Sequence, residues 1–162
     1  MRSVRVFSPA SVSNVCCGFD VLGFSIEGLG DEIIIKKSNS KEVKVKRISG
    51  YKVPFDAKKN TASVAAQALL DHLNIDQGFD LEIYKNIKPG SGIGSSASSA
   101  VGAVYGINKI LGSPFEKKEL LKFAMCGEFV SSDTAPADNI ASSLYGGLIL
   151  VNNRENYNVI QL

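Results

Sequence analysis

The sequence predicts an α+β fold, a two-layer sandwich in which helices cover one face of a mostly antiparallel sheet. Segments with the two-residue alternation or β-branched runs of strands dominate the chain before Asn60, whereas helical periodicity is found mainly after it. The resulting order of strands, helix, strand, helices and strand lacks the regular βα alternation of a parallel sheet. A chain of 162 residues suits one domain.

Strands are expected mainly in the first third of the chain. A short strand around Val4 and Val6 precedes residues 8–18, where small polar side chains after Pro9 predict a loop. Beyond that loop, β-branched runs and alternating side chains predict three strands, over residues 19–27, 31–37 and 42–48. An antiparallel meander is the simplest connection between the last two of these strands.

Helices follow from Asn60 onward. Apolar side chains recur on one face of residues 60–74, and Asn60 or Thr61 can cap that helix. Small and apolar side chains predict three further helices, over residues 97–111, 115–130 and 138–144. A loop is expected over residues 133–137, before the last of these helices. Alternation or apolar runs predict the remaining strands, over residues 79–84, 148–152 and 157–162.

The charge and cysteine content exclude some classes of protein. The net charge of +2, from 18 basic and 16 acidic residues, is too small to indicate a nucleic-acid partner. Cys16, Cys17 and Cys126 are odd in number and form no CxxC, so we expect reduced thiols in a cytoplasmic protein. We find no signal peptide and no apolar run near the roughly 20 residues that cross a membrane, so no membrane partner is expected.

A glycine- and serine-rich loop between a predicted strand and a predicted helix is the most informative segment. Its glycines permit positive φ, so backbone N–H groups can approach an anion, and the following helix points its positive end the same way. Serine hydroxyls there could bind phosphate or Mg²⁺. The loop is neither a Walker A loop nor a dinucleotide-binding fingerprint, and a plain turn that caps the helix is the alternative. The predicted anion site comprises Lys88, Pro89, Gly90, Ser91, Gly92, Ile93, Gly94, Ser95, Ser96, Ala97 and Ser98.

This loop resembles the Pro-x-x-x-Gly-Leu-Gly-Ser-Ser-Ala segment of the GHMP kinases, with Ile93 in place of leucine. The resemblance implies that residues 1–162 are the nucleotide-binding N-terminal domain of that family, which is similar to ribosomal S5 domain 2. It also implies ATP and Mg²⁺ as cofactors, with Ser96 and Glu128 at the metal and Asn60 near the adenine. Family members continue into a C-terminal domain, which the resemblance implies is absent from residues 1–162.

Residues 9–23 resemble a block typical of the homoserine kinase branch, Pro-Ala-Thr-Ser-Ala-Asn-Leu-Gly-Pro-Gly-Phe-Asp-x-Leu-Gly. Cys16-Cys17 replace its Gly-Pro, which could reshape the loop, but Asn14 and Asp20 keep their spacing. The resemblance implies that Asn14 contacts the substrate hydroxyl and Asp20 the substrate ammonium group. An amide that both donates and accepts, and a carboxylate that pairs with a cation, suit those tasks.

Residues 133–147 look like a second homoserine kinase block, Gly-His-x-Asp-Asn-Val-Ala-Pro-Ala-Leu-x-Gly-Gly. The histidine is missing, and Ala135-Pro136 stand in its region. The resemblance implies that Asp138 is a second ligand of the ammonium group and that Asn139 lies near the transferred phosphoryl group.

The implied reaction is transfer of the γ-phosphoryl group of ATP to the hydroxyl of L-homoserine, with Asn139 and Glu128 as catalytic residues. Such transfer relies on positioning and charge neutralisation more than on a strong base. Without a C-terminal domain we expect nucleotide binding, little turnover, and exposed apolar surface that could drive homodimer formation. The alternatives are a mevalonate-pathway GHMP kinase, a non-catalytic S5-like module that contacts RNA, and an inactive remnant.

Overall fold

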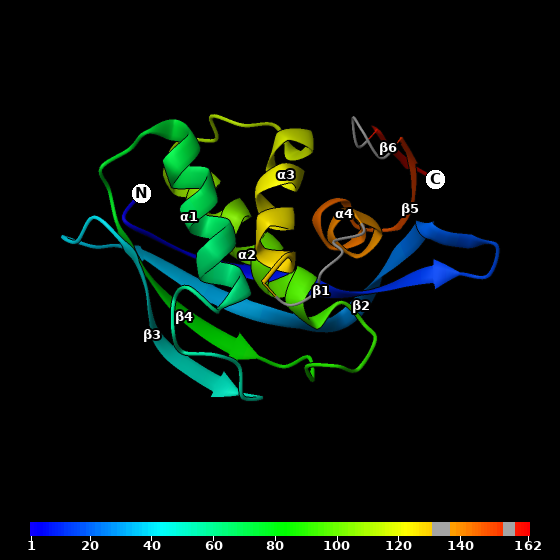
Figure 1. The fold of residues 1–162 in the computed structure, drawn as a ribbon, viewed down its shortest axis with the longest axis horizontal. Coiled ribbons are helices and arrows are strands. Elements are labelled where there is room, and N and C mark those ends of the chain that lie inside the picture. The colour runs from blue at the N-terminus through cyan, green and yellow to red at the C-terminus, as the bar shows by residue number, and fades with distance from the viewer. Residues whose placement is uncertain (131–136, 154–157) are drawn as a thin grey trace.

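The computed structural model describes residues 1–130, 137–153 and 158–162. Within these ranges the chain forms a six-stranded sheet and four helices. The helices lie together on one side of the sheet, so the predicted two-layer α+β sandwich is confirmed (Figure 1). In the part of the chain that is described, no helix has the length and apolar character needed to span a membrane.

Five strands follow one another across the sheet in the order β3-β4-β2-β5-β6, and β1 pairs with β2. The strands are β1 (Ser3–Val15), β2 (Gly18–Lys37), β3 (Val43–Gly50), β4 (Phe79–Lys85), β5 (Leu148–Asn153) and β6 (Asn158–Gln161). The helices are α1 (Thr61–Leu73), α2 (Ser95–Ile110), α3 (Lys117–Glu128) and α4 (Ala137–Tyr145).

The loop predicted over residues 8–18 is wrong, because β1 continues through most of it. β1 and β2 form one long antiparallel hairpin whose register runs from Ser3 opposite Lys36 to Val15 opposite Gly18. The small polar side chains suit a strand here because helices cover them and supply hydrogen-bond partners. Ser8 Oγ lies 3.1 Å from Ser143 Oγ, and Ser11 Oγ donates to Asn139 Oδ1 at 2.9 Å. The helices also donate to the backbone of β1, from Ser98 Oγ to Ser8 O at 2.7 Å and from Ser143 Oγ to Pro9 O at 2.9 Å.

The predicted meander is also wrong. β4 lies between β2 and β3, and β3 pairs with β4 in the parallel sense. The chain makes this parallel connection through α1, as a crossover between parallel strands requires. The other pairings are antiparallel, so the sheet is mostly antiparallel as predicted.

α2 is the central helix of the sandwich, and small residues let it lie close to the sheet. A methyl group added at Gly106 would be 2.2 Å from Cδ1 of Ile35, and one at Gly102 would be 2.9 Å from Cδ1 of Ile33. Because the helix touches the sheet this closely, its N-terminus is held at a fixed place beside the end of β4.

Most of the remaining elements agree with the sequence predictions. Asn60 caps α1, and Asn74 ends it in the left-handed conformation at φ 50°. α3 is shorter than the predicted helix, and α4 begins one residue before the predicted one. The loop expected before Ala137 and the start of the last expected strand at Tyr157 lie outside the described residues.

Candidate active site

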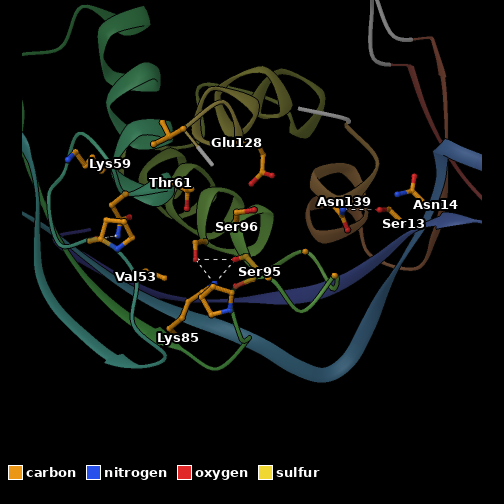
Figure 2. Close-up of a pocket in the computed structure, with 18 residues that line it drawn as sticks. Ser13, Asn14, Val53, Lys59, Thr61, Lys85, Ser95, Ser96, Glu128 and Asn139 are labelled. Atoms are coloured by element: carbon orange, nitrogen blue, oxygen red, sulfur yellow. Dashed lines mark hydrogen bonds between the residues drawn. The ribbon is translucent and has the colours of Figure 1, made fainter. Parts of the chain in front are cut away.

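A cavity of about 530 Å³ opens where the N-termini of α1 and α2 meet the C-terminal end of α3 and part of β1. Figure 2 shows its groups in order across the site, from Lys59 and Val53, past Ser96 and Glu128, to Asn139 and Asn14. The lining residues are Ser13, Asn14, Val53, Pro54, Lys59, Asn60, Thr61, Lys85, Pro89, Gly90, Gly92, Gly94, Ser95, Ser96, Ser99, Glu128, Val130 and Asn139.

The glycine-rich loop forms the floor of this cavity. Gly90, Gly92 and Gly94 adopt φ values of 74°, 79° and 65°, which glycine reaches without a Cβ penalty. A Cβ at Gly90 or Gly92 would meet no atom within 4 Å, so this backbone faces open space. Gly94 precedes the first turn of α2, where no side chain of the described residues caps the helix. The first N–H groups of α2 are therefore available to an anion.

Hydrogen bonds from three directions fix the loop. Ser95 Oγ donates to Ile87 O at 3.0 Å, and the backbone N–H of Ser11 in β1 donates to Ile93 O at 3.2 Å. Inside the loop, Ser91 N–H donates to Lys88 O at 3.2 Å. The loop is thus attached to the end of β4, to β1 and to α2, which gives its glycines a defined conformation before any ligand binds.

A buried ion pair lies under the loop. The Lys85 ammonium contacts the Asp31 carboxylate and the carbonyl oxygen of Ser95, and it donates to Ser99 Oγ at 2.8 Å. Asp31 also accepts from the backbone N–H groups of Asn86 at 2.9 Å and Ile87 at 3.0 Å. Burial lowers the pKa of Lys85, opposed by the Asp31 charge. This pair joins β2, β4 and the first turn of α2.

Asn60 is buried at the edge of the cavity, and both ends of its side chain are engaged within the protein. Oδ1 accepts from Ala62 N at 3.1 Å and from Ser63 N at 3.4 Å, while Nδ2 donates to Pro54 O at 2.7 Å. The predicted cap of α1 is confirmed. Because Asn60 also holds the Val53–Pro54 segment, it shapes the wall on the adenine side of the expected site.

Glu128 ends α3 and projects toward Ser96 at the start of α2 (Figure 2). Burial raises the pKa of its carboxyl, opposed by a hydrogen bond with Ser96 and by the charge of Lys85. Gly127 allows this placement, since a Cβ there would lie 2.5 Å from Thr61 O and 3.1 Å from the Cβ atoms of Ala65 and Ala100. α3 can thus approach α1 and α2 closely enough to bring the carboxylate to the loop.

Asn139 lies on α4 at the opposite end of the cavity, and β1 holds its side chain. Ser11 Oγ donates to Asn139 Oδ1 at 2.9 Å, and Asn139 Nδ2 donates to Ser13 Oγ at 2.8 Å. Its backbone N–H donates to Asp138 Oδ1 at 2.8 Å. The amide therefore lies between the glycine-rich loop and the tip of the β1–β2 hairpin.

Asn14 and Asp20 face each other across that hairpin tip, on either side of the turn at Cys16 and Cys17. Asp20 N–H donates to Asn14 Oδ1 at 2.9 Å, and both residues adopt positive φ, 60° for Asn14 and 59° for Asp20. Burial raises the pKa of Asp138, and the negative charge of Asp20 contributes to the same increase. The two carboxylates are thus near enough to interact, as expected of a pair that binds one cation.

Only part of the predicted anion site lines the cavity. Pro89, Gly90, Gly92, Gly94, Ser95 and Ser96 do so, together with Asn14, Asn60, Glu128 and Asn139. Lys88 and Ser91 are exposed beside the loop, whereas Ala97 and Ser98 are buried against the sheet. Ile93 contributes its carbonyl to β1. Asp20 and Asp138 lie beside the cavity without being among its lining residues.

Sequence reasoning missed Lys85, Asp31, Ser11 and Ser13. A signal for the first two existed, because Lys85 continues the buried alternation of Phe79, Leu81 and Ile83, and Asp31 that of Ile33 and Ile35. A charged residue on the buried face of a strand needs a partner. No comparable signal marks the serines.

The sequence profile described as "GHMP kinases N terminal domain" matches residues 60–147, a stretch that includes α1, the glycine-rich loop and α4. The chain belongs to the GHMP kinase family. The match includes the glycine-rich loop, Glu128 and Asn139, whereas the lining residues of the β1–β2 hairpin and of residues 53–59 lie outside it.

Homoserine kinases are among the relatives of this GHMP kinase chain. The one from Chlorobium phaeovibrioides is 42% identical over 93% of the chain and 51% of its own length. The one from Methanococcus vannielii is 33% identical over the whole chain and 54% of its own length. The chain therefore spans about half the length of the curated relatives it matches.

Solved structures also resemble this chain. The crystal structure of homoserine kinase from Cytophaga hutchinsonii superposes with a TM-score of 0.94 at 46% identity, covering all of this chain and 52% of that one. Mevalonate kinase from Methanococcus jannaschii superposes with a TM-score of 0.72 at 18% identity, over 98% of this chain and 55% of that one. The second likeness concerns the fold alone.

Proposed function

We propose that this chain is the nucleotide-binding part of a homoserine kinase, which transfers the γ-phosphoryl group of ATP to the hydroxyl of L-homoserine. One observation carries the proposal: the glycine-rich loop and Asn14 at the hairpin tip line the same cavity. A phosphoryl donor bound on the loop would then face an acceptor held at the hairpin. The homoserine kinases among the relatives support the choice of acceptor.

The nucleotide end of the cavity suits a triphosphate. The glycine backbone faces open space, and the N-terminus of α2 favours negative charge. The Val53–Pro54 wall and the neighbouring Thr61 offer an apolar surface and a hydroxyl to a base. We therefore place the phosphates over Gly90, Gly92 and Gly94 and the base beside Asn60.

Ser96 and Glu128 fit a magnesium site. Mg²⁺ in phosphoryl-transfer enzymes takes one or two protein oxygens and completes its shell with phosphate and water. Glu128 is a partly buried carboxylate, and burial raises its pKa despite the opposing hydrogen bond with Ser96 and the charge of Lys85. A dication there would restore the ionised form. When bound, the metal supplies neutralisation of the charge on the phosphates.

The acceptor end suits a small molecule with an ammonium group. Asp20 and Asp138 place two interacting carboxylates beside the hairpin tip, and a cation between them would relieve their mutual repulsion. Asn14 lies at the same tip and lines the cavity. This acidic pair favours an amino acid over an uncharged alcohol.

The proposed contribution of the protein to the reaction is to position the donor and the acceptor. The loop holds the donor, and the acidic pair and Asn14 hold the acceptor hydroxyl in line with it. Asn139, fixed between Ser11 and Ser13, offers an amide N–H to the group in transfer. No described residue stands out as a strong base, which agrees with a loose transition state that needs little proton abstraction.

The lengths of the relatives support a second domain in the complete protein. Phe19 at 66% exposure and Leu148 at 42% are apolar surface that such a domain, or a second copy, could cover.

Cys16, Cys17 and Cys126 are free thiols, which supports a reducing cytoplasmic compartment.

An acceptor screen tests the proposal. The natural protein that contains this chain should release ADP when given MgATP and L-homoserine, and should show little release with mevalonate. Preference for mevalonate would replace the proposal by the mevalonate-pathway alternative. A salt-dependent shift of RNA, without turnover on any acceptor, would favour the binding module.

A further inference from the structure

The side-chain amide of Asn139 is held at both ends by one strand. Ser11 Oγ donates to its Oδ1 at 2.9 Å, and its Nδ2 donates to Ser13 Oγ at 2.8 Å. Ser13 also lowers the pKa of Asp138, so its hydroxyl is near enough to stabilise the ionised carboxylate. These contacts make a chain, Asp138–Ser13–Asn139–Ser11, which we call the amide relay.

An irregularity in β1 places both serines on the helix side. The register of β1 against β2 shifts between Pro9 and Ser11, and Ala10 and Ser11 are both fully buried at 0% exposure. Consecutive buried residues break the ordinary alternation, so the residues after Pro9 change faces. Ser11 and Ser13 thereby reach Asn139, whereas regular alternation from Val6 and Ser8 would have turned them away.

Ser11 connects this relay to the glycine-rich loop. Its backbone N–H donates to Ile93 O at 3.2 Å, and a Cβ added at Gly94 would be 2.1 Å from its Oγ and 3.1 Å from Oδ1 of Asn139. The two roles of Ser11 are separable, because the backbone supports the loop and the hydroxyl supports Asn139. Replacing the hydroxyl alone should leave the loop bond in place.

Asp138 determines which way the hydrogen bonds of the amide relay point. Its Oδ1 accepts the backbone N–H of Asn139 at 2.8 Å, a hydrogen bond with the Ser13 side chain lowers its pKa, and an ionised carboxylate accepts hydrogen bonds but cannot donate them. Ser13 therefore orients its proton toward Asp138 and accepts the N–H of Asn139. Nδ2 of Asn139 then faces the hairpin and Oδ1 faces Ser11, whereas two serines without the carboxylate would accept either orientation of the amide.

We propose that Ser11 and Ser13 are positioning residues that, with Asp138, fix the Asn139 amide in one orientation beside the phosphate-binding loop. The inference rests on the proposed phosphoryl transfer and deepens it. It links the carboxylate expected to bind the acceptor ammonium group to the amide expected to meet the transferred group. Acceptor binding at Asp138 thus acts on the orientation of Asn139 through Ser13.

Kinetics of the natural protein test the relay. Ser11→Ala should lower kcat about tenfold, equivalent to ~1.4 kcal/mol, with the KM for ATP changed less than about twofold. Ser11→Thr, which keeps a hydroxyl, should recover most of the loss. In an Asn139→Ala background Ser11→Ala should cost nothing more, because the hydroxyl acts only through that amide. An unchanged kcat in Ser11→Ala, or an equal loss in both backgrounds, would overturn the relay.

The orientation can be observed without turnover. In the natural protein containing isotope-labelled asparagine, the side-chain amide signal of Asn139 is identified by its loss in Asn139→Ala. Ser11→Ala and Ser13→Ala should each shift that signal and speed its hydrogen exchange. Ser142→Ala, a buried serine of α4 outside the relay, should leave the signal unmoved. A signal indifferent to Ser11→Ala and Ser13→Ala refutes the relay, whereas absent turnover in the wild type refutes only the proposed kinase.

Discussion

The two ends of the cavity are built differently. Under the glycine-rich loop, Lys85 and Asp31 are buried, with side-chain exposures of 1% and 0%, and their hydrogen bonds join three secondary-structure elements. At the proposed acceptor end, Asn14 is exposed, and the hydrogen bond from Asp20 N–H to Asn14 Oδ1 crosses the hairpin tip between residues with left-handed backbone.

This contrast shows that the end of the cavity under the glycine-rich loop is the more rigid one. The donor end has its anchoring charges neutralised inside the fold, so the loop is organised before the nucleotide arrives. At the other end, burial and, after it, the negative charge of Asp20 raise the pKa of Asp138. Substitutions at the donor end should therefore damage folding and binding together, whereas those at the acceptor end should change affinity alone.

The largest effect is expected from breaking the buried pair. Asp31→Asn leaves Lys85 without its counter-charge and should lower the free energy of unfolding by about 3–5 kcal/mol. ATP binding should weaken as well, because the ion pair that anchors the glycine-rich loop is lost. Urea denaturation and nucleotide titration measure the two losses. The double variant Lys85→Met/Asp31→Leu should unfold less readily than Asp31→Asn, and the opposite ranking would show that the pair is not the anchor.

Removing the proposed metal ligand comes next. Glu128→Ala should lower kcat of the natural protein by about a hundredfold, ~3 kcal/mol, and weaken MgATP binding more than binding of ATP without metal. Glu42→Ala, which removes an exposed glutamate that does not line the cavity, is the control. Turnover like that of the wild type in Glu128→Ala with Mg²⁺ would remove Glu128 from the site.

A smaller and more selective effect is expected at the acceptor end. Asp20→Asn should raise the KM for L-homoserine about tenfold, because one of two carboxylates facing the ammonium group is lost. The affinity for ATP should stay the same. Glu27→Gln, an exposed acid on the same strand, provides the comparison. If ATP affinity falls together with homoserine affinity, the two ends are not independent.

The smallest effect is the pH dependence of stability without ligand. Burial raises the pKa of Glu128 from its ordinary 4.5, so the folded chain keeps a proton that the unfolded chain has lost. This contribution to stability is complete below the ordinary pKa and is lost as the pH rises through the raised one. Glu128→Gln should make unfolding in urea less pH-dependent as the pH rises above the ordinary pKa of 4.5. A steeper dependence in Glu128→Gln would contradict the raised pKa.

Local patterns predicted some elements well. The helices over α1, α2 and α4 were predicted because capping residues and small apolar side chains mark them directly. Residues 8–18 of the β1–β2 hairpin were mistaken for a loop because serine-rich segments favour loops when nothing covers them. Here α2 and α4 cover it, through Ser98 and Ser143.

The glycine-rich loop was recognisable from the chain alone, since positive φ at alternate glycines before a helix is a local property. The sequence likewise determined the layered fold, the family resemblance and the residue types at both ends of the site. Only the tertiary structure decided that β4 lies between β2 and β3, that Lys85 meets Asp31, and that a shift in β1 turns Ser11 and Ser13 toward Asn139. Those outcomes depend on which surfaces pack together across long stretches of chain, and packing between distant segments leaves no mark on local periodicity.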